Sequence, residues 1–128
     1  MIVVDTSVWV SALRSPASPE TPFLLSLLDA DEVVLAVPVR VELLSGASVA
    51  DRLKLRRTLS ALPVLYPTDA TWQLIDTWTE TAVKRGHRFG LGDLLIGAMA
   101  AKHTALVWSL DADFARMESL GLVGRYAV

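Results

Sequence analysis

The sequence predicts a three-layer α/β/α domain with a central parallel sheet. Its short apolar runs lack the alternation with polar residues that a half-exposed strand shows, which is typical of strands covered on both faces. Segments of helical periodicity separate these runs, as expected when a helix joins each parallel strand to the next. The 128 residues are enough for one compact domain and too few for two ordinary ones. We therefore expect a single domain over residues 1–128.

Three apolar runs are the expected buried strands. Residues 2–4 are β-branched and too few for a helix, and residues 33–37 form a second run after an acidic segment. Residues 105–110 form the third run. The last residues, 123–128, alternate in character, which predicts an additional strand at the edge of the sheet.

Helical periodicity fills the intervals between the strands. A short helix is expected behind Pro22, and another after Asp51, which is the expected N-cap. Residues 70–85 carry an apolar stripe, and Gly86 ends that helix. Residues 93–102 are nearly all apolar, as expected of a helix that packs against the sheet on one side and against more protein on the other.

The composition excludes several kinds of site. The absence of cysteine excludes disulfide scaffolds, thiol chemistry and cysteine-based zinc sites, and two histidines are too few for a multi-histidine metal site. With a net charge of −2, the chain needs local basic clusters or a cation to hold a polyanion. No apolar stretch reaches the ~18 residues of a membrane-spanning helix, and the first residues lack the basic region of a secretory signal. We expect a cytoplasmic protein with no membrane contact.

Four acidic residues are the candidate site. They come from four separated segments, each just after a strand or in the first turns of a helix: Asp5, Glu42, Asp93 and Asp111. Asp113 is the second choice for the fourth position. A doubly wound sheet brings such positions to one edge, where the carboxylates repel one another unless a cation neutralises them. Mg²⁺ and Mn²⁺ prefer oxygen ligands, and such an ion can activate a water for attack on a phosphodiester.

Each acid also has a structural interpretation. Asp5 and Asp93 are each placed to cap the helix that follows, and either Asp111 or Asp113 is placed to cap the next short helix. Glu42 lies one turn into a helix, where it is either exposed or directed inward. The placement of all these acids together, rather than any single residue, supports a metal site.

Four stretches between Ile2 and Phe114 carry a further signal: IVVDTSVWV, VPVRVELLSG, GLGDLLIGAMA and VWSLDADF. On these stretches, taken in this order, the sequence resembles the PIN-domain ribonucleases, and most closely the VapC-type toxins of bacterial toxin–antitoxin pairs. The resemblance implies a parallel sheet with helices on both sides and an acidic pocket that binds Mg²⁺ or Mn²⁺. It also implies cleavage of RNA, chiefly tRNA or rRNA, a homodimer, and inhibition by a cognate antitoxin.

Carried over by position, the resemblance assigns roles to particular residues. The acidic quartet corresponds to Asp5, Glu42, Asp93 and Asp111, Asp113 is the second acid of the family's Asp-x-Asp-Phe ending, Ser109 matches a pocket hydroxyl, and Thr6 or Ser7 supports Asp5.

Two basic clusters receive different interpretations. Arg85 and Arg88 lie in a segment that leads into the turn before Asp93, so we expect them to contact RNA phosphates. The other cluster is interpreted as a solvated helix face; it comprises Arg52, Lys54, Arg56 and Arg57.

Two alternatives to a ribonuclease are considered. The first is a protein-binding module that has kept the fold and lost the chemistry, which the intact set of acids disfavours. The second is a phosphatase that forms an aspartyl-phosphate on Asp5. That class requires a second aspartate two residues further on, where this chain has Ser7, so this alternative is weaker.

Overall fold

The computed structural model describes residues 1–128 and contains four strands and seven helices. The strands are β1 (Ile2–Val4), β2 (Val33–Ala36), β3 (Val64–Leu65) and β4 (Leu106–Trp108). The helices are α1 (Thr6–Arg14), α2 (Thr21–Asp29), α3 (Val37–Gly46), α4 (Val49–Ser60), α5 (Asp69–Lys84), α6 (Leu91–Lys102) and α7 (Ala112–Ser119).

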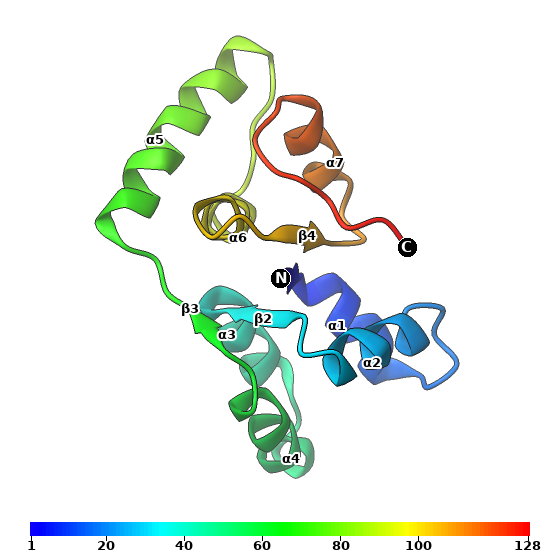
Figure 1. The fold of residues 1–128 in the computed structure, drawn as a ribbon. Helices are drawn as coiled ribbons and strands as arrows, with labels where there is room; N and C mark the ends of the chain where they lie inside the picture. Colours follow the sequence, from blue (N-terminus) through cyan, green and yellow to red (C-terminus); the bar gives the residue numbers. More distant parts are fainter.

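The strands form one parallel sheet in the order β3-β2-β1-β4. Ile2 of β1 pairs with Val33 on one side and with Leu106 on the other. Figure 1 shows α5, α6 and α7 at the β4 end of the stacked strands, α3 and α4 at the β3 end, and α1 and α2 beside the strands between them. The predicted three-layer α/β/α architecture is therefore confirmed.

The strand order reverses at β1, which places the site. The chain moves outward from β1 to β2 and β3, then returns to the other side of β1 to form β4. In parallel sheets of this kind, ligands bind beyond the carboxyl ends of the two strands that flank the reversal. Here those ends lead into Asp5 after β1 and Ser109 after β4, and the Asp5 N–H donates to the Trp108 carbonyl at 2.9 Å.

The core is continuous from the sheet into α6. β1 and β2 are fully buried, and α6 contacts β1, β2, β4 and α3, with buried side chains along most of its length. This agrees with the predicted helix covered on both sides. No helix is both long enough and apolar enough to cross a membrane.

Two expectations about local structure are wrong, and one short strand was not predicted. The helix after Asp51 is capped by Ser48, whose hydroxyl accepts from the Asp51 N–H at 3.2 Å, because the helix begins one turn earlier than predicted. The tail makes one parallel bridge, between Val107 and Arg125, rather than a full edge strand. The two-residue strand β3 was not predicted, because its register comes from pairing with β2 rather than from a pattern of its own.

Gly97 lets α6 pack closely against its neighbours. A Cβ at this position would lie 3.2 Å from Trp78 Cζ3 and Val123 Cγ1 and 3.3 Å from Met117 Sδ. We expect Gly97→Leu to lower the free energy of unfolding by about 2 kcal/mol or more, because it overpacks a filled core. Gly92→Leu in the same helix is the control, since nothing lies within 4 Å of a Cβ there. Equal unfolding midpoints of the two variants in urea would contradict this account.

Candidate active site

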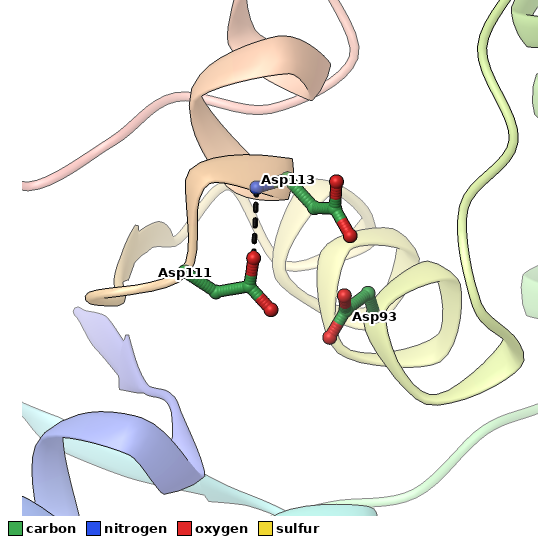
Figure 2. Close-up of side chains that lie close together, drawn as sticks. All are labelled: Asp93, Asp111 and Asp113. Carbon is green, nitrogen blue, oxygen red and sulfur yellow. Dashed lines mark hydrogen bonds between the residues drawn. The ribbon is translucent and has the colours of Figure 1, made fainter.

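Three carboxylates from two segments of the chain meet at the carboxyl edge of the sheet. Asp93 lies in the first turn of α6, Asp111 follows β4, and Asp113 lies in the first turn of α7. One carboxylate oxygen from each lies within 4.8 Å of the others. Figure 2 shows the three side chains facing one another across the space between α6 and α7. This spacing suits oxygen ligands around one cation.

Asp5 is buried next to this cluster, with only one of its oxygens occupied. Its side chain is 6% exposed. The Oδ2 atom accepts hydrogen bonds from Ser7 Oγ and Ser109 Oγ, both at 2.7 Å, and from the Ser7 N–H at 3.4 Å. Asp5 is thus the N-cap of α1, in agreement with its structural interpretation. Its Oδ1 accepts no hydrogen bond from the protein, so capping and ligand binding are compatible.

Ser109 links the two sides of the reversal point. While its Oγ donates to Asp5, it also accepts from the Asp111 N–H at 2.9 Å. Ser7 Oγ forms a matching link, because it accepts from the Leu110 N–H at 3.0 Å. These two hydroxyls fix the loop after β4 against the end of β1, and so fix the position of Asp111 relative to Asp5.

The acids are coupled electrostatically beyond the three that lie closest. The pKa of Asp93 is raised to about 7, first by partial burial and then by the charges of Asp111, Asp5, Asp113 and Glu42, in that order. Burial, followed by the charge of Asp5, raises the pKa of Glu42 on α3. All five acids named from the sequence therefore act on one region of space, although Asp5 and Glu42 lie outside the tightest cluster.

Asp93 does not cap α6, contrary to its structural interpretation, whereas Asp111 does cap α7. The N-cap residue of α6 is Gly90, which has no side chain to form a cap, and Asp93 is the third residue of the helix, with no hydrogen bond to its carboxylate. Asp111 does cap α7, because its Oδ1 accepts from the Asp113 N–H at 2.9 Å. Asp93 therefore has no hydrogen-bond partner, although its charge is favoured in general by the N-terminus of α6.

Sequence comparison identifies the family. The sequence profile described as PIN domain matches residues 2–120. The VapC ribonuclease Mb1587 of Mycobacterium bovis is 32% identical to this chain over 123 residues, which cover 89% of each protein. This chain belongs to the PIN-domain family of VapC ribonucleases. Ribonuclease VapC11 of Mycobacterium tuberculosis matches with the same identity and coverage.

Solved structures agree on the fold. VapBC2 from Rickettsia felis, crystallised with a fragment of its promoter DNA, matches this VapC-family chain with a TM-score of 0.80 at 18% identity, covering 98% of both chains. FitAcB from Neisseria gonorrhoeae matches with a TM-score of 0.82 at 21% identity, covering 98% of this chain and 97% of that one. At such low identity the likeness shows the fold alone.

The donor set of this VapC-family site fits a hard divalent cation. Hydrogen bonds reach one oxygen each of Asp5, Asp111 and Asp113, and none reaches the carboxylate of Asp93. Each of the four carboxylates therefore keeps at least one oxygen free of protein donors. An all-oxygen set of this kind matches Mg²⁺ or Mn²⁺ and excludes the softer metals that need sulfur or imidazole.

The remaining predicted residues take different positions. Thr6 does not bond to Asp5, and its buried hydroxyl has no hydrogen-bond partner. Arg85 ends α5 and Arg88 lies in the exposed loop before α6, and neither forms an ion pair. Sequence reasoning missed Arg116, whose Nη1 lies 2.7 Å from Asp113 Oδ1. The i,i+3 spacing of this acid and arginine within α7 was the available signal.

Ser109 is expected to act as a positioning residue for Asp5 and Asp111. We expect Ser109→Ala to raise the Mn²⁺ concentration needed for half-maximal RNA cleavage by about 10- to 100-fold, as loss of a group that orients a metal ligand typically does. Ser109→Thr keeps the hydroxyl and should restore most of the affinity. Ser26→Ala, at an exposed serine of α2, is the control. Unchanged Mn²⁺ dependence in Ser109→Ala would show that the hydroxyl does not position these acids.

Proposed function

We propose that this chain is a Mg²⁺- or Mn²⁺-dependent endoribonuclease that acts as the toxin of a toxin–antitoxin pair. The observation that carries the proposal is the convergence of Asp93, Asp111 and Asp113, with oxygens within 4.8 Å, beside the buried Asp5. Carboxylates brought this close oppose folding, and Arg116 pairs with Asp113 alone, so the retention of the other acids beside it is explained by a cation that they hold. The VapC ribonucleases that match most of the chain support the same chemistry.

The acids have distinct roles in this proposal. Asp5, Asp93, Asp111 and Asp113 hold the cation, which supplies an activated water and stabilises the negative charge that develops on the phosphodiester. Ser7 and Ser109 hold Asp5 in one orientation through its Oδ2.

The other side chains complete the site. Glu42 adds negative charge from the α3 side, next to Asp5. Arg116 shares one oxygen of Asp113 and limits the freedom of that carboxylate. Arg85 and Arg88 contact phosphates of the RNA, which we propose to be tRNA or rRNA.

The proposed partners are a cognate antitoxin and a second copy of this chain. A groove of about 550 Å³ between α1, α3 and α4 is lined by Glu42 together with apolar side chains such as Trp9, Leu13 and Leu55. Because Glu42 belongs to both the groove and the acidic region, a protein segment in this groove would block access to the acids.

Metal-dependent cleavage is the direct test of the proposal. Purified protein should cleave RNA when Mg²⁺ or Mn²⁺ is present and should stop when EDTA is added. Sequencing of RNA ends after induced expression should reveal a narrow set of new 5′ ends that are absent for Asp5→Asn. Cleavage that continues in EDTA, or equally in Asp5→Asn, would contradict the proposed site.

Calorimetry separates this proposal from a binding module without activity. Mg²⁺ or Mn²⁺ titrated into the wild-type protein should release or absorb heat with saturation. The variant that lacks the Asp5 and Asp93 carboxylates should show only the heat of dilution. Equal traces for both proteins would favour the inactive module.

A further inference from the structure

A second charged feature lies on the side of α3 opposite the acids. It is a hollow of about 660 Å³ between α3, α4 and β3, which we call the arginine hollow. Three arginines line it: Arg40 from α3, and Arg52 and Arg56 from α4. No acidic side chain lines it, although the whole chain carries more acidic than basic residues.

Two of the three arginines are held by contacts within the protein, and none of the three is neutralised. The guanidinium of Arg40 lies 5.7 Å from the centre of the Tyr66 ring and donates to the Tyr66 hydroxyl at 3.4 Å. Arg52 donates to the carbonyl of Leu44. None of the three arginines takes part in the ion pairs of the structure. Their positive charge is therefore positioned and available for an external anion.

On sequence alone, the basic cluster on α4 is interpreted as one solvated helix face. In the structure, its side chains line different surfaces. Lys54 turns to the groove beside Glu42, Arg52 and Arg56 turn to the arginine hollow, and Arg57 lines neither. Because Arg52 and Arg56 are four residues apart, they lie on the same face of α4. Their partner Arg40 comes from a different helix, which a search for local runs of charge could not reveal.

The hollow offers hydrogen-bond donors suited to phosphate oxygens. Besides the three arginines, its polar side chains are Ser45 and Ser60, whose hydroxyls donate to the carbonyls of Glu42 and Arg57, so the donors open to an anion are the guanidinium groups. Planar guanidinium groups match the geometry of phosphate, and several uncompensated charges favour a polyanion over a single small anion. A sugar–phosphate backbone meets both conditions.

We propose that the arginine hollow binds phosphates of the RNA substrate at a distance from the bond that is cleaved. This inference rests on the proposed ribonuclease function. α3 carries Glu42 to the acidic site and Arg40 to the hollow on its other side. A helix with its side chains is about 10–12 Å wide, so a bound strand passes around α3 and is held several nucleotides from the scissile phosphate.

Charge reversal at neighbouring positions of α4 tests the inference. Arg56→Glu places a negative charge in the hollow, and Arg57→Glu makes the same change in net charge outside it. We expect Arg56→Glu to weaken binding of a fluorescent 20-nucleotide single-stranded RNA, measured in EDTA to prevent cleavage, by at least about tenfold. Arg57→Glu should weaken it by less than about threefold. Circular dichroism melts check that both variants fold.

Salt dependence gives a second measurement of the same interaction. The slope of log Kd against log salt should decrease by about 0.7 for each phosphate that Arg56→Glu no longer binds, and Arg40→Gln should decrease it in the same way. Equal effects of Arg56→Glu and Arg57→Glu would overturn the inference and leave the ribonuclease function intact. If the two variants affect RNA binding equally but Arg56→Glu alone loses binding to poly-glutamate, the hollow is instead a site for an acidic protein segment. Conversely, wild-type protein that binds RNA through Arg56 but never cleaves it would overturn only the proposed function.

Discussion

Asp93→Asn is expected to reduce metal-dependent RNA cleavage by at least about a thousandfold. This corresponds to about 4 kcal/mol of lost transition-state stabilisation, which is within the range that a catalytic metal contributes. The carboxylate of Asp93 accepts no hydrogen bond from the protein, and its pKa responds to all four of its acidic neighbours. The amide keeps the volume of the side chain and removes its negative charge. Initial rates of cleavage at saturating Mn²⁺ provide the measurement.

The control for this loss is an acid elsewhere on the protein. Asp76→Asn removes one carboxylate from the exposed face of α5 and should cleave at the wild-type rate. Substrate binding in EDTA should persist in Asp93→Asn, so that the defect appears in turnover rather than in affinity for RNA. If Asp93→Asn retains more than about a tenth of the wild-type rate at saturating Mn²⁺, Asp93 is not an essential ligand.

The positions of the acids were predictable because topology fixes them. In a parallel sheet, each strand delivers its next residue to the same edge, so Asp5 and Asp111 had to approach one another once β1 and β4 were neighbours. The position of Asp93 was predictable because a turn leads into the apolar helix α6, and Asp93 lies in the first turn of that helix. The buried strands and the apolar α6 carry strong patterns, which explains why the architecture was readable from the sequence alone.

The details that escaped prediction depend on contacts between distant segments. The ion pair of Arg116 with Asp113 competes with any cation for one oxygen, and its geometry is decided by the turn of α7. The meeting of Arg40 with Arg56 depends on how α3 packs against α4. The two-residue strand β3 forms because β2 presents an open edge, and too few residues take part to give a periodic signal.

The metal-free protein is expected to lose stability as the pH rises from about 4 to 8. Asp93 has a pKa of about 7 in the folded protein and an ordinary value of 3.8. Between these values the folded state binds more protons than the unfolded state, so the free energy of unfolding decreases with rising pH. The favourable contribution of protonated Asp93 is complete below the lower value and lost as the pH passes through 7.

Asp93→Asn removes this dependence, because an amide does not titrate. Melting curves in EDTA should give similar Tm values for the wild type and the variant near pH 4, and a variant Tm higher by several degrees at pH 8. Asp76→Asn should follow the wild-type curve at both pH values.

A divalent cation should offset the loss of stability that deprotonated Asp93 causes, and it should do so in the wild type alone. Mn²⁺ at 100 times its Kd stabilises a folded protein by about 2.7 kcal/mol, and it should bind more tightly at pH 8 than at pH 6 because it competes with the proton on Asp93. The difference in Tm at pH 8 therefore narrows when Mn²⁺ is added: the variant melts higher in EDTA, and in Mn²⁺ the wild type gains stability while the variant gains little. A Tm difference that stays constant across pH, with equal responses to Mn²⁺, would show that the repulsion among these acids is not what the cation relieves.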